Sequence, residues 1–96
     1  MSRYVVRHQH DSEHCPAKDP KMGEMLLSHL SPANASKYGV RLEGEGVIDG
    51  QHTLYLILDA ERESQVENFM QPFAQAGPIE VLAASPCEAV VERGGC

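Results

Sequence analysis

Basic residues are scarce in this sequence, and no stretch of it concentrates positive charge. The chain has 8 lysines and arginines against 14 acidic residues, which gives a formal net charge of −6. Proteins that bind the phosphates of nucleic acids need a basic stripe on their surface. No apolar run approaches the roughly 20 residues of a membrane-spanning helix. We therefore expect neither a nucleic acid nor a membrane as a partner.

A secretory signal and a paired-cysteine motif are also missing. Segment 1–8 lacks the apolar core of about 7–15 residues that signal peptides contain. The cysteines number 3, and none has the CxxC spacing of zinc knuckles and redox pairs. Free thiols fit a reducing compartment, so we expect a cytoplasmic protein.

The chain does contain enough apolar sequence for one small folded domain. Its 96 residues are 42% hydrophobic, close to the average for globular proteins. A chain of this length forms one domain, here residues 1–96. Small domains bury a modest fraction of their surface and often gain stability by associating.

The first part of the chain predicts a strand, a loop and two short helical pieces. Residues Tyr4–His10 begin with aromatic and β-branched side chains, as strands often do. The polar residues 11–18 predict a loop. Asp19-Pro20 has the cap-and-proline pattern of a helix start, and apolar residues follow it at helical spacing. Ser31-Pro32 repeats this pattern, so we expect a second short piece that runs to Tyr38.

Two strands around Asp49-Gly50 form the clearest pattern in the sequence. Residues Val40–Ile48 and Gln51–Leu58 flank this dipeptide, which is typical of two-residue hairpin turns. Such a turn pairs the residues that flank it directly, and it places His52 in the second strand, opposite Val47. This second strand is apolar on both faces, which indicates that both of its faces are covered.

The rest of the sequence predicts a helix, a strand and a short terminal helix. We expect the helix to begin at Asp59 and to end at Gly77-Pro78. A strand follows at Ile79–Ala84. Ser85-Pro86-Cys87-Glu88 has the pattern of a capping box, so it predicts the start of a short helix.

The predicted order is β-α-β-β-α-β with a short C-terminal helix, which is the α+β ferredoxin-like arrangement. Four antiparallel strands form one sheet, and the helices cover one of its faces. The apolar side chains of the other face require a second sheet. We therefore expect a homodimer in which two sheets face each other as a dimeric α/β barrel, with room for a small-molecule ligand in its lumen.

Three histidines and a cysteine lie close together at the end of the first strand. His8, His10, His14 and Cys15 fall within eight residues, and imidazole and thiolate are ligands that transition metals prefer. His8 and His10 share one face of their strand, and the topology brings His52 beside them. These five residues are the predicted ligands of a transition metal ion, for which Ni, Cu and Zn are equally suited. A chance grouping of histidines that bind nothing is the alternative.

Three other side chains have competing interpretations. His29 lies on the apolar stripe of its helix, where a packed core residue is expected. Cys87, at a predicted helix N-terminus, is either a reactive thiolate or a buried structural cysteine. The topology places it at the opposite end of the sheet from His8. Cys96 ends a Gly-Gly-Cys tail and is either a further ligand or idle.

Two segments resemble a known family. Tyr4-Val-Val-Arg-His8 and Leu54-Tyr-Leu-Ile-Leu-Asp-Ala60 are similar to segments of the small nickel-binding ferredoxin-like proteins, which belong to the dimeric α/β-barrel superfamily. The resemblance covers most of the chain in layout, but only these segments in residues. It implies that His8 is a metal ligand. The segment His10–Cys15 and the Gly-Gly-Cys tail depart from the family pattern, so the identity of the metal stays open.

Three functions are compatible with these patterns. The first is a cytoplasmic, dimeric protein that binds a transition metal for sequestration, delivery or sensing. The second is a small dimeric α/β-barrel enzyme, isomerase-like or monooxygenase-like, in which His8 or His52 is the general acid–base and Glu45 tunes it. The third is a ligand-binding module that performs no chemistry.

Overall fold

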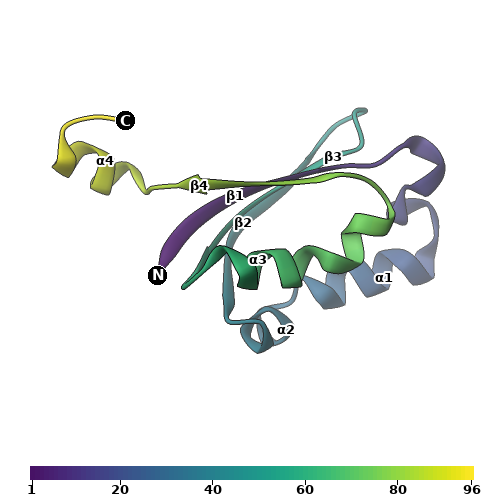
Figure 1. Cartoon of the computed structure of the whole chain (residues 1–96). Helices are drawn as coiled ribbons and strands as arrows, with labels where there is room; N and C mark the ends of the chain where they lie inside the picture. Colours follow the sequence, from purple (N-terminus) through teal and green to yellow (C-terminus); the bar gives the residue numbers. More distant parts are fainter.

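The computed structural model describes residues 1–96 and contains one antiparallel sheet of four strands in the order β2-β3-β1-β4. This order and the C-terminal helix confirm the predicted α+β, ferredoxin-like fold (Figure 1). None of its helices combines the length and the apolar character needed to cross a bilayer. The elements are β1 (Ser2–Gln9), α1 (Pro20–His29), α2 (Pro32–Lys37), β2 (Val40–Ile48), β3 (Thr53–Ala60), α3 (Glu63–Met70), β4 (Ile79–Ala84) and α4 (Cys87–Arg93), with 3-10 turns η1 (Ser12–His14), η2 (Pro16–Lys18) and η3 (Gln71–Gln75).

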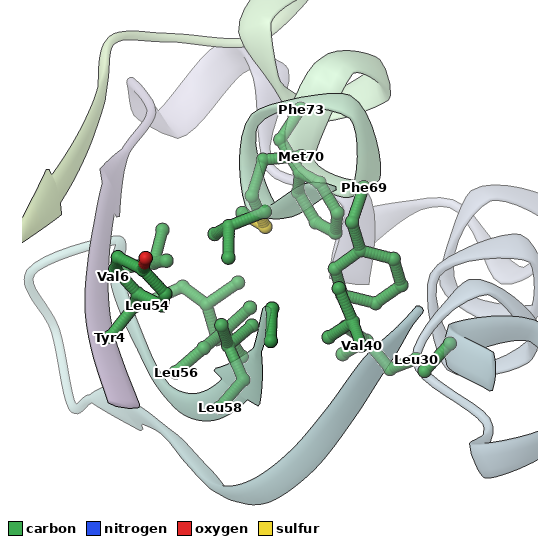
Figure 2. Packing of buried hydrophobic residues seen from close by; sticks show 13 residues of the cluster. Tyr4, Val6, Leu30, Val40, Leu54, Leu56, Leu58, Phe69, Met70 and Phe73 are labelled. Carbon is green, nitrogen blue, oxygen red and sulfur yellow. The ribbon is translucent and has the colours of Figure 1, made fainter. Parts of the chain in front are cut away.

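Helices α1, α2 and α3 all lie on one side of the sheet, and α4 projects beyond the end of β4 (Figure 1). The core fills the space between the sheet and α3 with its following turn η3 (Figure 2). Side chains from one face of β1 and β3 meet Phe69, Met70 and Phe73 there. The buried apolar residues are Tyr4, Val6, Leu30, Ala35, Val40, Leu54, Leu56, Leu58, Ala60, Val66, Phe69, Met70 and Phe73.

The other face of the sheet is open, and β3 is apolar on this face too, as the sequence predicts. Tyr55 is 37% exposed and Ile57 is 41% exposed, whereas the alternate residues of the strand are buried in the core. Val5 of β1 pairs with Ile57 on one side and with Leu82 of β4 on the other. An apolar row therefore crosses the open face.

Helices α1 and α2 begin as their sequences predict. The Asp19 side chain accepts a hydrogen bond from the Lys21 amide, and Ser31 accepts one from the Asn34 amide. Each cap satisfies an amide that has no partner within the helix. A proline in the first turn follows each cap, where its missing N–H costs nothing.

One other predicted helix start and one predicted capping box are wrong. Asp59 lies within β3, and α3 begins only at Glu63, where the Arg62 amide donates to the Gln65 side chain. The predicted helix α4 is present, but the capping box at its start is not: Pro86 is the N-cap residue, and the Ser85 hydroxyl accepts a hydrogen bond from Arg93 Nη1.

The predicted two-residue turn at Asp49-Gly50 is also wrong. Ile48 pairs with Thr53 rather than with Gln51, so four residues connect β2 to β3. His52 is consequently the last residue of the connection and does not belong to β3. A β-bulge between Leu42 and Gly44 shifts the register further along this pair of strands.

Asp59 is a buried carboxylate that joins three strands on the open face. It accepts hydrogen bonds from Arg3 Nε of β1 at 3.0 Å and from Arg41 Nη2 of β2 at 3.1 Å. The guanidinium of Arg3 is the main reason that the pKa of Asp59 lies below its ordinary value. A buried charge requires this kind of pairing, because an unpaired one is costly to desolvate.

Candidate metal centre

The site lies at the end of the sheet where β1 exits and the β2–β3 connection turns, opposite to the end that carries α4 (Figure 1). His10 is the first residue beyond β1, and its amide donates to the carbonyl oxygen of His52 at 3.1 Å. This bond continues the antiparallel ladder between β1 and β3 by one step. It therefore fixes the two histidines beside each other.

His52 reaches this position through a left-handed backbone conformation. Its φ is 51°, and it is the one residue other than glycine with a positive φ in the chain. This conformation is uncommon for residues with a side chain, although histidine adopts it more often than most. The Gln51 amide closes the turn on the Ile48 carbonyl at 3.1 Å, and the Thr53 hydroxyl donates to the Gln51 carbonyl. Together these bonds hold His52 facing the exit of β1.

Cys15 comes to the site through the loop that follows β1. Two 3-10 turns, η1 and η2, meet at this residue, which is half-buried and carries a free thiol. The Asp11 side chain caps the first turn by accepting from the His14 amide at 3.0 Å. The Asp19 amide ends the second turn on the Pro16 carbonyl. The loop is thus structured on both sides of the cysteine.

His10, Cys15 and His52 form a cluster of metal-ligand type, which we call the His-Cys-His cluster. One ligand atom from each residue lies within 4.8 Å of the other two. The His10 and His52 rings meet edge to face, with centroids 5.2 Å apart. Ligands around a tetrahedral ion are separated by about 3.5 Å, as follows from metal–ligand bonds of about 2.0–2.3 Å. The three ligand atoms would therefore have to approach one another by at most about 1.3 Å to bind one ion.

The His10 imidazole is the most unusual group of the cluster. Both of its ring nitrogens are buried, and neither has a hydrogen-bond partner. Burial lowers the pKa of His10, and the neighbouring imidazoles of His8 and His52 lower it further, against an opposing effect of Asp11. The ring is therefore neutral at pH 7, and neutral imidazole is the form that binds metal ions.

His8 lies next to this cluster but outside it. The residue is 1% exposed and packs under η3, where its Nε2 atom donates to the Phe73 carbonyl oxygen at 2.8 Å. Its ring is 5.6 Å from that of His10, centroid to centroid. Burial lowers the pKa of His8, and the bond to Phe73 opposes this effect only in part. His8 also points to the helix side of the sheet, away from the open face where a barrel lumen would form.

His14 is turned away from the His-Cys-His cluster. Its side chain is 61% exposed, and its Nδ1 atom is bonded to the Asp11 carboxylate at 2.5 Å. An aspartate three residues before a histidine, at the start of a helical turn, is a sequence signal for this local pairing. Of the five predicted ligands, the structure therefore brings together His10, Cys15 and His52, and it leaves His8 and His14 outside.

The remaining histidine and the other cysteines take no part in the site. His29 is a packed residue, as the sequence predicts: its ring stacks on Phe69 at 4.7 Å, and its Nε2 atom donates to the Phe69 carbonyl. Cys87 and Cys96 are free and exposed at the far end of the sheet. Cys87 is therefore not the buried structural cysteine that was one of its two interpretations. Glu45 lines a different pocket, beside α2.

A pocket of about 230 Å³ adjoins the His-Cys-His cluster. No pattern in the sequence indicates this pocket, because its walls come from segments far apart in the chain. Asp49 is the one lining side chain with a formal charge at pH 7, and no lysine or arginine lines the pocket. The other lining residues are His8, His10, Cys15, Pro16, Ala17, Leu26, Val47, Ile48, Gly50, His52, Leu54 and Phe73.

Comparison of the chain with protein-family models and with curated proteins finds no match. The interpretation of the site therefore depends on its own geometry and chemistry.

Proposed function

We propose that this chain binds a transition metal ion through His10, Cys15 and His52. The observation that supports this most directly concerns His10, whose two ring nitrogens are buried without a hydrogen-bond partner and whose ligand atom lies within 4.8 Å of a second imidazole and a thiol. A buried polar atom without a partner costs about 1–3 kcal/mol. A metal ion bonded to one nitrogen replaces the missing partner and draws the three ligand atoms together.

The ligand types indicate which ions fit. Two neutral imidazoles and one thiolate suit Zn, Cu and Ni, whereas hard cations such as Mg and Ca prefer oxygen ligands. The β1–β3 ladder fixes the backbones of His10 and His52, so that these two ligands are held in place before the ion binds. The cysteine comes from a separate loop and completes the set. The resemblance to the nickel-binding ferredoxin-like proteins makes nickel one of the ions to be tested.

Metal titration of the untagged protein tests this proposal. We use a Cys87→Ser/Cys96→Ser background, in which Cys15 is the sole thiol. We expect one Zn, Ni or Cu ion per chain after gel filtration, measured by elemental analysis. Replacement of His10 by Ala, Cys15 by Ser or His52 by Ala removes a ligand and is expected to lower the affinity by more than roughly tenfold, since the loss of even an outer-shell partner costs this much.

His14→Ala is the matched control for this experiment. His14 belongs to the same loop as Cys15, but it is exposed and outside the cluster. We expect this variant to keep its metal. A wild-type background without bound ion, or cluster variants that retain as much metal as the control, would contradict the proposal.

We also propose that the open face of the sheet pairs with the same face of a second copy of the chain. Its apolar row includes Ile57 and Leu82, which are 41% and 46% exposed. Arg7 and Glu80 are cross-strand neighbours beside this row. A two-fold axis through such a face brings like apolar side chains together and allows each arginine to meet the partner's glutamate.

Helix α4 gives a second reason for association. It has only 7 residues, none of them is buried, and Val91 is 78% exposed. An isolated helix of this length is marginal in water, so helices of this size depend on packing against other elements. In a single copy of the chain, α4 projects away from the layered body (Figure 1). A second copy provides the surface that one chain lacks.

Substitution of Ile57 by Arg tests the association. A charge in the middle of the apolar row must be desolvated on pairing, so we expect this variant to be a monomer where the wild type is a dimer. Sedimentation equilibrium at micromolar concentration measures the two masses. Leu27→Arg is the control, because Leu27 is 70% exposed on α1, on the opposite side of the sheet. A monomeric wild type would contradict the pairing.

A further inference from the structure

We propose that Cys87 and Cys96 form a dithiol pair that exchanges with small-molecule disulfides, and that its oxidised form is a disulfide bond closing a covalent ring that contains α4. The pair is separate from the proposed metal site, because α4 lies at the opposite end of the sheet from the His-Cys-His cluster (Figure 1). Three features support it, namely the path of the chain after α4, the contacts of Arg93 and the open surroundings of the two thiols.

The chain reverses its direction directly after α4. Gly94 has a φ of 81°, in the left-handed region that glycine adopts without strain. The amides of Gly94 and Gly95 both donate to the carbonyl oxygen of Val90, at 3.1 and 3.2 Å, and so close the end of the helix. The ribbon that follows turns back beside α4 instead of continuing away from it (Figure 1).

The returning segment is long enough to reach the start of α4. From Cys87 to Arg93 the helix rises by about 9 Å, at about 1.5 Å per residue. Residues 94–96 span at most about 10 Å when extended, at about 3.3–3.6 Å per residue. A disulfide bond requires α-carbons about 4.4–6.8 Å apart. A tail of this length can therefore bring Cys96 within bonding reach of Cys87, provided that it runs straight back.

Arg93 holds the tail in this direction. Its Nε atom donates to the carbonyl oxygen of Gly95 at 2.9 Å, and its Nη2 atom donates to that of Cys96 at 3.4 Å. Its Nη1 atom donates to the hydroxyl oxygen of Ser85 at 3.1 Å, and Ser85 is two residues before Cys87. One planar guanidinium therefore binds both the residue that carries one thiol and the segment that leads to the other.

No packing opposes the remaining approach of Cys96 to Cys87. A β-carbon added at Gly94 or at Gly95 would meet no atom within 4 Å, so the tail has open space around it. Both thiols are free and exposed. The third thiol, that of Cys15, belongs to the cluster at the other end of the sheet. Within one chain, Cys87 and Cys96 therefore have only each other as partners.

The exposure of the pair favours reversible exchange over a permanent cross-link. Exposed disulfides are more easily reduced than the buried ones that stabilise secreted proteins. Helix α4 has 7 residues, none of them buried, and a free helix of this length is marginal in water. A cross-link restricts the open conformations of the segment that it closes. Oxidation of the pair is therefore expected to stabilise α4, and reduction to release it.

The reaction is a two-step thiol–disulfide exchange. The thiolate of one cysteine attacks a sulfur atom of the small disulfide, which forms a mixed disulfide and releases one small thiolate. The thiolate of the other cysteine then attacks the protein sulfur of the mixed disulfide, which closes the ring and releases the second small thiolate. The two protons lost by the cysteines are taken up through solvent by the two small thiolates. The small disulfide is thus reduced to two thiols, and the cysteine pair is oxidised.

Mass spectrometry tests this inference, with 2-hydroxyethyl disulfide as the probe. The probe is uncharged, which suits a chain with a formal net charge of −6. The Cys15→Ser protein, in which Cys87 and Cys96 are the only thiols, is equilibrated with mixtures of the probe and 2-mercaptoethanol. We expect a product that has lost two hydrogen atoms, carries no probe and runs as a single chain on denaturing gels without reductant. Replacement of either remaining cysteine by serine should stop the reaction at the mixed disulfide.

Two glycine variants in the same background test the path of the tail. Alanine at Gly94 or at Gly95 meets no neighbouring atom, but only Gly94 has a positive φ. We expect Gly94→Ala to lower the ratio of closed ring to open dithiol by roughly 5- to 30-fold, as follows from the cost of the left-handed conformation for a residue with a β-carbon. Gly95→Ala is the matched control and should leave this ratio nearly unchanged.

The results that would overturn the inference are also specific. A Cys15→Ser protein that keeps the probe on both cysteines shows that the two thiols do not meet. A product that links two chains shows that the cysteines pair between molecules instead. Equal ring formation by Gly94→Ala and Gly95→Ala shows that the reversal after α4 does not position Cys96. None of these results bears on the metal site, which is titrated in protein that lacks both cysteines.

Discussion

Replacement of Gly77 by alanine is expected to destabilise the protein by more than about 3 kcal/mol, which is above the usual range for overpacked positions. A β-carbon at Gly77 would lie 1.8 Å from the carbonyl oxygen of Gln9 and 3.1 Å from the α-carbon of His10. Both neighbours are backbone atoms, which cannot rotate away as a side chain would. The strand end must therefore move, and His10 moves with it.

Two measurements follow from this close approach. The midpoint of thermal unfolding should fall by more than about 12 °C, because 1 kcal/mol corresponds to about 4–8 °C in a domain of this size. The displaced His10 should also weaken metal binding in whatever fraction of the variant stays folded. Gly23→Ala, within α1, is the control. A β-carbon at Gly23 would meet only the carbonyl oxygen of Pro16, at 3.7 Å. Alanine has a higher helix propensity than glycine, so the free energy of unfolding of this variant should rise by up to about 1 kcal/mol. An unfolding midpoint for Gly77→Ala equal to that of the wild type would contradict the expected clash.

Asp59→Asn is expected to lower the free energy of unfolding by about 2 kcal/mol near pH 7. Hydrogen bonds to charged groups contribute about 1.5–3 kcal/mol, and this substitution removes the charge. The asparagine amide has the shape of the carboxylate but lacks its charge. Its NH₂ group also faces the donors of Arg3 or Arg41, which bond to the two carboxylate oxygens in the wild type. Urea unfolding of both proteins measures the difference.

The pH dependence of this difference identifies its cause. The pKa of Asp59 is lowered in the folded chain, mainly by the hydrogen bond from Arg3. The stability that the carboxylate contributes is therefore complete above its unfolded pKa of about 3.9 and is lost as the pH falls through the lower folded value. The difference in the free energy of unfolding between wild type and Asp59→Asn should stay constant from neutral pH down to about pH 5. It should become smaller below about pH 4.

Glu43→Gln serves as the comparison for Asp59→Asn. Glu43 also bonds to Arg41, with Oε1 at 2.6 Å from Nε, but the Arg41 side chain is 66% exposed. Ion pairs in contact with water contribute little because solvent screens them. We therefore expect a much smaller loss of stability from this substitution. A gap between wild type and Asp59→Asn that does not change with pH would show that lost packing, rather than lost charge, causes the effect.

The fold followed from the sequence because its signals are local. Proline after Asp19 and after Ser31 marks two helix starts, and the structure has both. The alternation of Tyr55 and Ile57 with buried leucines predicts a strand that is apolar on both faces, and this is what the structure shows. Side-chain period and capping act over a few residues, so the surrounding fold changes them little.

Three local sequence patterns predicted a turn or a helix cap that the structure does not have. Asp49-Gly50 is a strong two-residue turn signal, yet the chain closes a four-residue connection there. Asp59 reads as a helix cap, but two arginines from neighbouring strands hold it within β3. Ser85 reads as a cap for α4, but Arg93 takes its hydroxyl group. At Asp59 and at Ser85, a partner that the local pattern does not include forms a competing contact.

The candidate site was also determined partly by the sequence and partly by the tertiary structure. The sequence by itself determined that histidines and a cysteine gather at the end of β1 and that the β2–β3 connection brings His52 to them. Only the tertiary structure decided which of them meet. The Nε2 atom of His8 is bonded to the Phe73 carbonyl under η3, and His8 does not belong to the group of ligand atoms that lie within 4.8 Å of one another. Cys15 belongs to this group, and two 3-10 turns meet at it in the loop after β1. Loop paths and carbonyl positions depend on contacts between distant segments, and no local pattern of residues encodes them.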